Sequence, residues 1–194
     1  MRPIVRLALA ITACALAACR SSPPPPEVWE REPDYYLPHD VLGHVHKPDS
    51  RRLTTVPEHP DGAVELRTNG LGFRNDRNPT TPKPVGTWRA LVVGDSHTDG
   101  VVDNRDGVGD ALARVLEIDR REQGIELRAE VINGGTGYWG PAQYAEAFSV
   151  WAALEPDLCI VILYEGNDFL DAVDANLMDL KMLSRSVLIL RVRP

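Results

Sequence analysis

The sequence lacks any excess of positive charge. It has 21 lysine and arginine residues against 28 aspartate and glutamate residues, which gives a formal net charge of −7 at pH 7. No basic stripe runs along the chain, so nothing in it indicates nucleic-acid binding. The first apolar strand-like run is followed by neither Gly-Lys-Ser nor Gly-x-Gly-x-x-Gly, which argues against a phosphate-binding loop. We expect no cofactor and no metal.

The sequence also has no apolar run long enough to span a bilayer as a helix. Arg2 and Arg6 precede an uncharged run from Leu7 to Cys19, and small residues close that run. This pattern is typical of an export signal, which we place at residues 1–18. A buried amino-terminal helix is the alternative.

Cysteine is scarce, with three residues in 194. Leu16-Ala17-Ala18-Cys19 resembles the lipobox of bacterial lipoproteins, and this resemblance implies that Cys19 receives a lipid and becomes the first residue. Cys14 would leave with the signal, and Cys159 lies in an apolar run, so we expect no intramolecular disulfide. Arg20 follows the lipid site, and by the same resemblance we expect an outer-membrane anchor that faces the periplasm.

Two segments separate this anchor from the main domain. Residues 19–32 contain four consecutive prolines and predict a stiff, extended tether. Residues 33–87 form an amino-terminal extension that is rich in proline. Within it, Val64 to Arg67 alternates in polarity and is followed by Thr68-Asn69-Gly70, which predicts a strand that enters a β-hairpin turn.

From Trp88 the sequence alternates between strand and helix patterns, which predicts a parallel doubly wound, flavodoxin-like three-layer α/β sandwich over residues 88–194. The expected strands cover residues 90–93, 126–132 and 158–164, and the expected helices follow them. The helix faces predicted from spacing are Val108, Ala111, Leu112, Val115 and Leu116; Tyr144, Ala147, Phe148 and Trp151, beginning near Pro141; and Phe169, Val173, Leu177 and Leu180.

If the first strand lies between the second and the third, all three carboxyl ends meet at one edge, where such sheets bind ligands. The third strand, residues 158–164, would then need a further partner, because an exposed apolar edge invites aggregation. Residues 187–192 are a candidate fourth strand. Otherwise the domain is incomplete, or its extension or a partner covers it.

Three motifs that could carry catalytic chemistry follow the three expected strands. They are Gly94-Asp95-Ser96, the glycine-rich segment from Asn133 to Gly140, and Gly166-Asn167-Asp168. A hydroxyl, a glycine-rich turn and a carboxamide are the parts needed to attack an ester and to hold the oxyanion that results.

In this order and at these strand ends, the motifs resemble the nucleophile, glycine and asparagine blocks of the SGNH (GDSL-type) hydrolase family. The resemblance implies that Ser96 is the nucleophile and that Asn167 is an oxyanion donor. It places the glycine donor at Gly137, with Gly135 as second choice, although the commonest family spacing points to Tyr138.

Each motif also has a purely structural interpretation. Ser96 could cap the helix that follows it, and Asn167-Asp168 could cap the next helix. Gly134, Gly135 and Gly137 could simply form a turn. The three motifs together favour catalysis.

The sequence lacks one part of this machinery. The family's base is a histidine preceded by an aspartate three residues earlier, and no such Asp-x-x-His occurs after Ser96. His97 is a poor substitute, because neighbouring side chains at a helix start point apart. Surface or packing roles are expected for the histidines of the extension, His39, His44, His46 and His59. His44 and His46 would share a strand face, but no third metal ligand is evident.

The resemblance therefore implies an ester hydrolase, or acyltransferase, that acts on acyl groups of cell-envelope polysaccharide or lipid. The alternatives are a non-catalytic glycan-binding or scaffold lipoprotein, and an inactive fragment that lacks the catalytic histidine.

Overall fold

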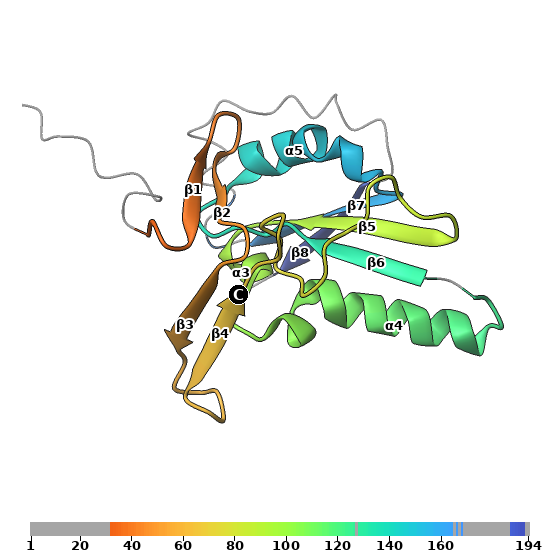
Figure 1. Ribbon diagram of the computed structural model, residues 1–194, viewed down its shortest axis with the longest axis horizontal. Helices are drawn as coiled ribbons and strands as arrows, with labels where there is room; N and C mark the ends of the chain where they lie inside the picture. The colour runs from red at the N-terminus through yellow and green to blue at the C-terminus, as the bar shows by residue number, and fades with distance from the viewer. Residues whose placement is uncertain (1–31, 127, 165, 167, 169–186, 193–194) are drawn as a thin grey trace, which may run out of the picture.

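The computed structural model describes residues 32–126, 128–164, 166, 168 and 187–192 (Figure 1). Its strands are β1 (Tyr36–His39), β2 (Gly43–His46), β3 (Arg51–Thr55), β4 (Ala63–Arg67), β5 (Thr87–Val93), β6 (Arg128–Asn133), β7 (Leu158–Tyr164) and β8 (Val187–Val192). Its helices are α3 (Ser96–Asp99), α4 (Val108–Glu122) and α5 (Pro141–Val150), with short 3₁₀ turns η1 (Asn104–Asp106) and η2 (Ala152–Leu154).

The main sheet has the strand order β6-β5-β7-β8, and every neighbouring pair in it is parallel. The predicted order, with the first strand between the second and the third, is confirmed. So is the strand at residues 187–192, which pairs with β7 from Cys159 to Tyr164 and turns that apolar strand into an interior one. The expected third helix over residues 169–180 lies outside the described residues.

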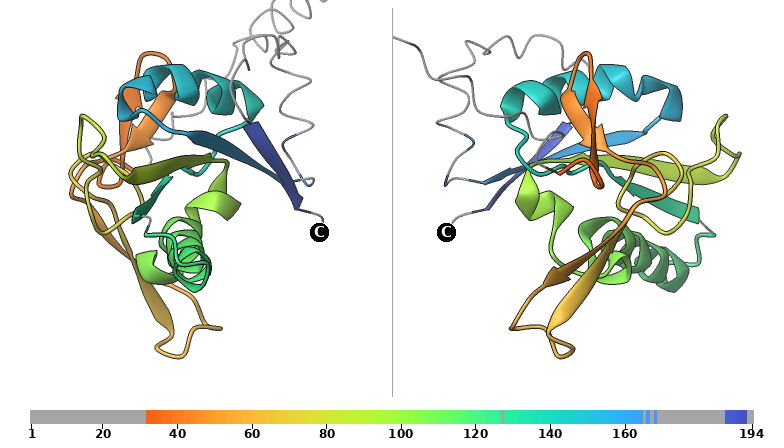
Figure 2. Two further views of the ribbon diagram at one scale, coloured as in Figure 1. Left: turned by 90° about the vertical axis from the view of Figure 1, so that its right-hand side faces the viewer. Right: turned by 60° about the vertical axis from the view of Figure 1, so that its left-hand side comes forward.

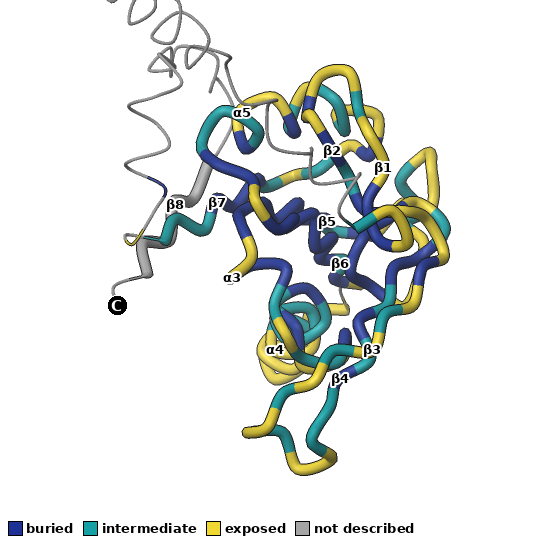
Figure 3. The backbone as a smooth tube through the Cα atoms, turned by 90° about the vertical axis from the view of Figure 1, so that its left-hand side faces the viewer, coloured by how far each residue is buried: buried dark blue, intermediate teal, exposed yellow. Residues whose placement is uncertain are grey.

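Helix α4 covers one face of this sheet and helix α5 the other (Figure 2). Ala90 and Val92 of β5 belong to the cluster that packs against α4, whereas Leu91 and Val93 belong to the cluster that contains α5. Successive strand residues point to opposite faces, so a run buried on both sides can serve both helices. Figure 3 shows β5 as the most continuously buried strand. The protein is therefore an α/β fold with a four-stranded parallel sheet.

Helix α4 packs with a slightly different face from the predicted one. Val115 is 62% exposed, and the buried stripe runs instead along Gly109 and the side of Leu112 and Leu116. A Cβ atom on Gly109 would lie 3.0 Å from the carbonyl oxygen of Val131 on β6. The closest approach of helix and sheet is therefore at a glycine, which apolar spacing does not reveal.

The amino-terminal extension contains two antiparallel hairpins, β1–β2 and β3–β4. The predicted strand at Val64 to Arg67 is confirmed as part of β4, but the turn predicted at Asn69-Gly70 is wrong. Strand β4 pairs with β3, which precedes it, and the hairpin turn lies between Thr55 and Ala63. The Asn69 side-chain oxygen accepts hydrogen bonds from the amides of Leu71 and Phe73 and shapes a loop instead.

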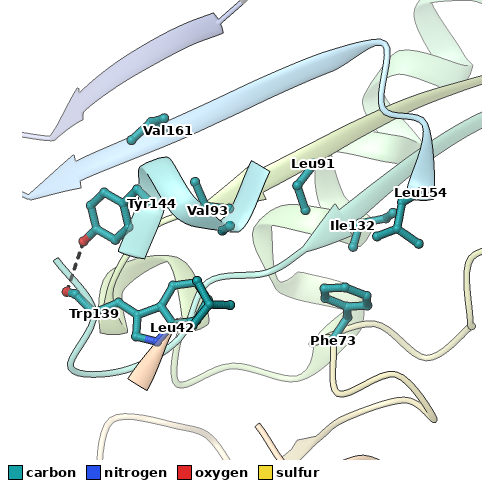
Figure 4. Packing of buried hydrophobic residues seen from close by; sticks show 10 residues of the cluster. Leu42, Phe73, Leu91, Val93, Ile132, Trp139, Tyr144, Leu154 and Val161 are labelled. Atoms are coloured by element: carbon teal, nitrogen blue, oxygen red, sulfur yellow. Dashed lines mark hydrogen bonds between the residues drawn. The ribbon is translucent and has the colours of Figure 1, made fainter. Parts of the chain in front are cut away.

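The extension packs into the core of the parallel sheet. Leu42 and Phe73 lie in one buried cluster with Leu91, Ile132 and Trp139 (Figure 4). In the same view the Tyr144 hydroxyl oxygen of α5 lies 3.2 Å from the carbonyl oxygen of Trp139. The segment before β5 is thus part of the same hydrophobic core.

Strand β6 is an edge strand, as its alternating pattern predicts, and one side chain covers part of its open edge. The carboxamide of Asn75 donates to the carbonyl of Val131 at 3.0 Å and accepts from the amide of Asn133 at 2.8 Å. These are the two bonds that a neighbouring peptide would make. Asn75 is buried, so it replaces a strand partner where water has little access.

Replacing Asn75 with alanine should lower the free energy of unfolding by about 1–3 kcal/mol, because a buried donor and a buried acceptor on β6 lose their partners. Urea unfolding followed by circular dichroism measures this. Asn78→Ala is the control, since Asn78 is exposed three residues away. Equal stability of the two variants would contradict this role.

Candidate active site

Ser96 is the first residue of helix α3, directly after the carboxyl end of β5. The residue that caps this helix is Asp95, whose Oδ1 atom accepts a hydrogen bond from the amide of His97 at 2.9 Å. The capping interpretation of Ser96 is therefore wrong. Ser96 is exposed, and its hydroxyl makes no hydrogen bond to any residue in the described part of the chain. A hydroxyl that supports no local structure remains available for a ligand.

Thr98 fixes the glycine loop beneath this helix. A Cβ atom on Gly94 would lie 2.0 Å from Thr98 Oγ1, and one on Gly135 would lie 2.5 Å from the Thr98 methyl group. Both positions must be glycine for the loop to approach so closely. The Asn133 carboxamide adds a bond to the carbonyl of Thr98 at 3.1 Å. The ends of β5 and β6 are thereby brought together.

The backbone amides of the glycine loop are mostly used within the protein. The amides of Gly134, Gly135 and Thr136 donate to Val92 O, Asn133 Oδ1 and Gly94 O, respectively. Gly135 is therefore already bonded. The amide of Gly137 donates to no residue within the described ranges, while its carbonyl accepts from His44 Nε2 at 2.8 Å.

Gly137 lies against the helix that carries Ser96. A Cβ atom built on Gly137 would be 3.8 Å from Asp99 Oδ2 and only 2.7 Å from the Tyr36 hydroxyl. The structure therefore brings the Ser96 turn and the Gly137 loop together, as the strand order predicts. Tyr138 follows with φ of 65° and is 58% exposed. Its ring lies edge-on to Tyr36 and His44, and its hydroxyl donates to Glu32 at 3.1 Å.

Two predicted positions, Asn167 and Cys19, lie outside the described residues. The residue after Asn167 is described: Asp168 is fully buried and accepts from the Tyr144 hydroxyl at 2.9 Å and from the Tyr164 amide at 2.8 Å. The carboxylate ties this part of the chain to α5 and to the end of β7.

His97 does not bond to Ser96. Its Nδ1 atom donates to the Asp95 carboxylate, with Nδ1 3.2 Å from Oδ2, and its ring stacks on Tyr164 at a centroid distance of 3.7 Å. Asp95 is nearly fully buried, so this pair has a fixed geometry. The expectation that His97 points away from Ser96 agrees with these contacts.

Two histidines of the extension have partners that the sequence does not indicate. His46 Nε2 donates to Asp99 Oδ2 at 3.1 Å, and both side chains are buried. His44 holds the Gly137 carbonyl, as described above. His39 and His59 have only local roles and accept from backbone amides two or three residues away. Within the ranges described, no group of three or more potential metal ligands is found.

Asp99 also bonds to Arg74, a second unforeseen contact between the extension and α3. Arg74 Nη1 lies 2.8 Å from Asp99 Oδ1, with both side chains buried. Burial by itself raises the pKa of the Asp99 carboxyl group, but the nearby His46 and Arg74 outweigh it and hold that pKa below its ordinary value. Asp99 therefore remains ionised inside the protein.

This lowered pKa makes stability depend on pH. Between the lowered pKa and the ordinary value of 3.8, the unfolded chain binds more protons than the folded one, so stability falls as pH decreases. The contribution of Asp99 is fully present above that ordinary value and is lost as pH falls through the folded pKa.

Urea unfolding at a series of acidic pH values should show a shallower decline of the free energy of unfolding in Asp99→Asn than in the native chain. Asp61→Asn, at an exposed position, should leave the decline unchanged. Equal declines in the native chain and Asp99→Asn would contradict this assignment.

Two surface cavities of about 330 and 410 Å³ are both lined in part by Asn75, Asp76 and Asn78. Neither is lined by Ser96 or Gly137, so both lie apart from the site.

The helices among the described residues include none with the length and apolar character to cross a membrane. Neither protein-family models nor curated proteins match this chain.

Proposed function

We propose that this protein is an ester hydrolase of the SGNH (GDSL-type) kind that acts on acyl groups of cell-envelope polysaccharide or lipid. The observation that carries the proposal is an exposed Ser96 hydroxyl on helix α3, which packs against a loop whose Gly137 amide donates to no described residue. A nucleophile next to a preorganised N–H donor suits the tetrahedral intermediate of acyl transfer. Helices on both sheet faces support a doubly wound, flavodoxin-like three-layer domain.

In this mechanism the Ser96 oxygen attacks the acyl carbon, and the carbonyl electron pair moves onto oxygen. The Gly137 amide and the Asn167 carboxamide stabilise that charge. The bond between the acyl carbon and the alcohol oxygen then breaks, and the alcohol of the sugar or lipid leaves with the proton that Ser96 has lost. Water, or a second hydroxyl in a transferase, then attacks the acyl-serine and regenerates Ser96. One oxyanion donor is typically worth a factor of about 10² to 10³ in rate.

The base is the missing part of this mechanism. No described imidazole bonds to Ser96, and His97 is held by Asp95. Without a base the serine hydroxyl stays protonated, and loss of a triad histidine costs on the order of 10⁶ in kcat. This observation favours a second candidate, a non-catalytic glycan-binding or scaffold lipoprotein that binds acylated glycans at the same sheet edge.

We expect a fluorophosphonate probe to label the purified chain slowly and only at Ser96. Mass spectrometry of the labelled peptide measures the rate, and Ser96→Ala should abolish labelling, whereas Ser149→Ala, at another exposed serine, should not. Asn167→Ala should slow labelling by a factor of about 10² to 10³ if its carboxamide stabilises the oxyanion.

Fast labelling that disappears in Ser96→Ala would show that the chain supplies its own base. Labelling that persists in Ser96→Ala would overturn the assignment of the nucleophile. Glycan binding that survives in Ser96→Ala, with no turnover of p-nitrophenyl acetate by the native chain, would favour the scaffold function.

We also propose that Cys19 carries the lipid anchor after removal of residues 1–18 and that residues 19–32 space the domain from the outer membrane. The resemblance of Leu16 to Cys19 to a lipobox supports this placement. Several acyl chains would anchor a protein stably where one gives only marginal binding.

Replacing Cys19 with serine should therefore move the protein from the membrane fraction to the soluble periplasmic fraction of an expressing Gram-negative cell. Cell fractionation with immunoblotting and incorporation of radiolabelled palmitate measure this, and Cys14→Ser is the matched control. Unchanged membrane association and palmitate incorporation in Cys19→Ser would refute the anchor.

A further inference from the structure

We propose that the amino-terminal extension sets the geometry of the catalytic site, with Arg74 and His44 as positioning residues for Ser96 and Gly137. This inference rests on the proposed role of Ser96 as nucleophile. It assigns the extension a part in the chemistry, although no residue of the extension touches the reacting atoms.

Arg74 spans the segment that directly follows the nucleophile helix. Its Nη1 atom donates to Asp99 Oδ1 at 2.8 Å and to the carbonyl of Gly100 at 3.1 Å. Nη2 donates to the carbonyl of Val102 at 2.9 Å, and Nε donates to Asn104 Oδ1 at 3.2 Å. One planar guanidinium group therefore holds four residues between positions 99 and 104, an arrangement that a lysine ammonium group cannot reproduce.

One further hydrogen bond connects this segment to Ser96. Asp99 is the last residue of α3, and the amide of Gly100 donates to the carbonyl of Ser96 at 2.9 Å. The guanidinium group fixes the carbonyl of Gly100, so it also fixes the end of the turn that begins with Ser96. A helix of four residues has little stability of its own and needs such outside support.

Strand β2 contacts both helix α3 and the Gly137 loop. His46 bonds the second oxygen of Asp99, and His44, two residues earlier on the same strand face, bonds the carbonyl of Gly137 at 2.8 Å. The spacing between two residues on one face of a strand is fixed by the backbone. Strand β2 thus sets the separation between the helix that carries the hydroxyl and the loop that carries the amide.

Arg89 provides a matched control for Arg74. It is also fully buried and paired, with Nη2 2.6 Å from Glu130 Oε2, but it lies near the start of β5, seven residues before Ser96. Replacing either arginine with lysine keeps the charge and removes the guanidinium fork. Only the change at Arg74 alters support for the nucleophile turn.

The test compares Arg74→Lys with Arg89→Lys in the full chain. Arg74→Lys should slow fluorophosphonate labelling of Ser96 by a factor of about 10², the typical cost of misplacing a reacting group by one ångström. Amide hydrogen exchange should accelerate in residues 96–104 and remain unchanged in α5. Arg89→Lys should leave both labelling and exchange of residues 96–104 unchanged.

A third measurement does not depend on catalysis. In a Ser96→Cys background, the pH profile of alkylation by iodoacetamide reports the surroundings of the new thiol. Arg74→Lys should shift this profile, and Arg89→Lys should not. Because lysine keeps the positive charge, a shift reports changed geometry. If Arg74→Lys fails to fold, His44→Gln and His46→Gln replace it in the same three measurements.

Native exchange of residues 96–104 and an unchanged alkylation profile in a folded Arg74→Lys variant would overturn the positioning role. Labelling that persists in Ser96→Ala would instead overturn the proposed function. In that case the exchange and alkylation measurements still decide whether Arg74 supports the turn.

Discussion

The buried ion pair between Arg74 and Asp99 is the constraint on which the candidate site depends. Charges removed from water are costly unless each one is paired and its remaining hydrogen bonds are made. Asp99 satisfies this condition through Arg74 on one oxygen and His46 on the other. The two partners come from the extension, whereas Asp99 belongs to helix α3. The pair therefore stabilises one arrangement of the extension relative to the sheet, in which the extension supplies Arg74 and His46 and the segment after β5 supplies Asp99.

The rest of the site is built outward from this pair. The glycine loop packs against helix α3 at Thr98, whose side chain fills the space that the missing Cβ atoms of Gly94 and Gly135 leave. Tyr36 of the extension stacks on His46 and lies edge-on to Tyr138 of the loop after β6. Ring contacts and hydrogen bonds from the extension thus both reach the segments that follow β5 and β6.

Local patterns in the sequence were sufficient for the strands of the parallel sheet, for their order and for the presence of helices α4 and α5. The apolar run of β5 and the first-turn proline of α5 are signals that act over a few residues. The pairings of the site act over much longer separations: Arg74 and Asp99 are 25 residues apart, His46 and Asp99 are 53 apart, and His44 and Gly137 are 93 apart. A single sequence carries no signature of such contacts. The turn placed at Asn69-Gly70 failed for a different, local reason. The Asn69 side chain accepts from the amides two and four residues later and shapes a loop, and β4 pairs with β3, which precedes it.

The carboxamide of Asn75 on the open edge of β6 has a consequence for assembly. A sheet edge with unused peptide groups is a template on which a second chain can add a strand. Here the carbonyl of Val131 and the amide of Asn133 are already occupied by a side chain of the same molecule. Two copies of this protein could pair at this end of β6 only by breaking both bonds. Asn75 therefore opposes edge-to-edge association of copies along this strand.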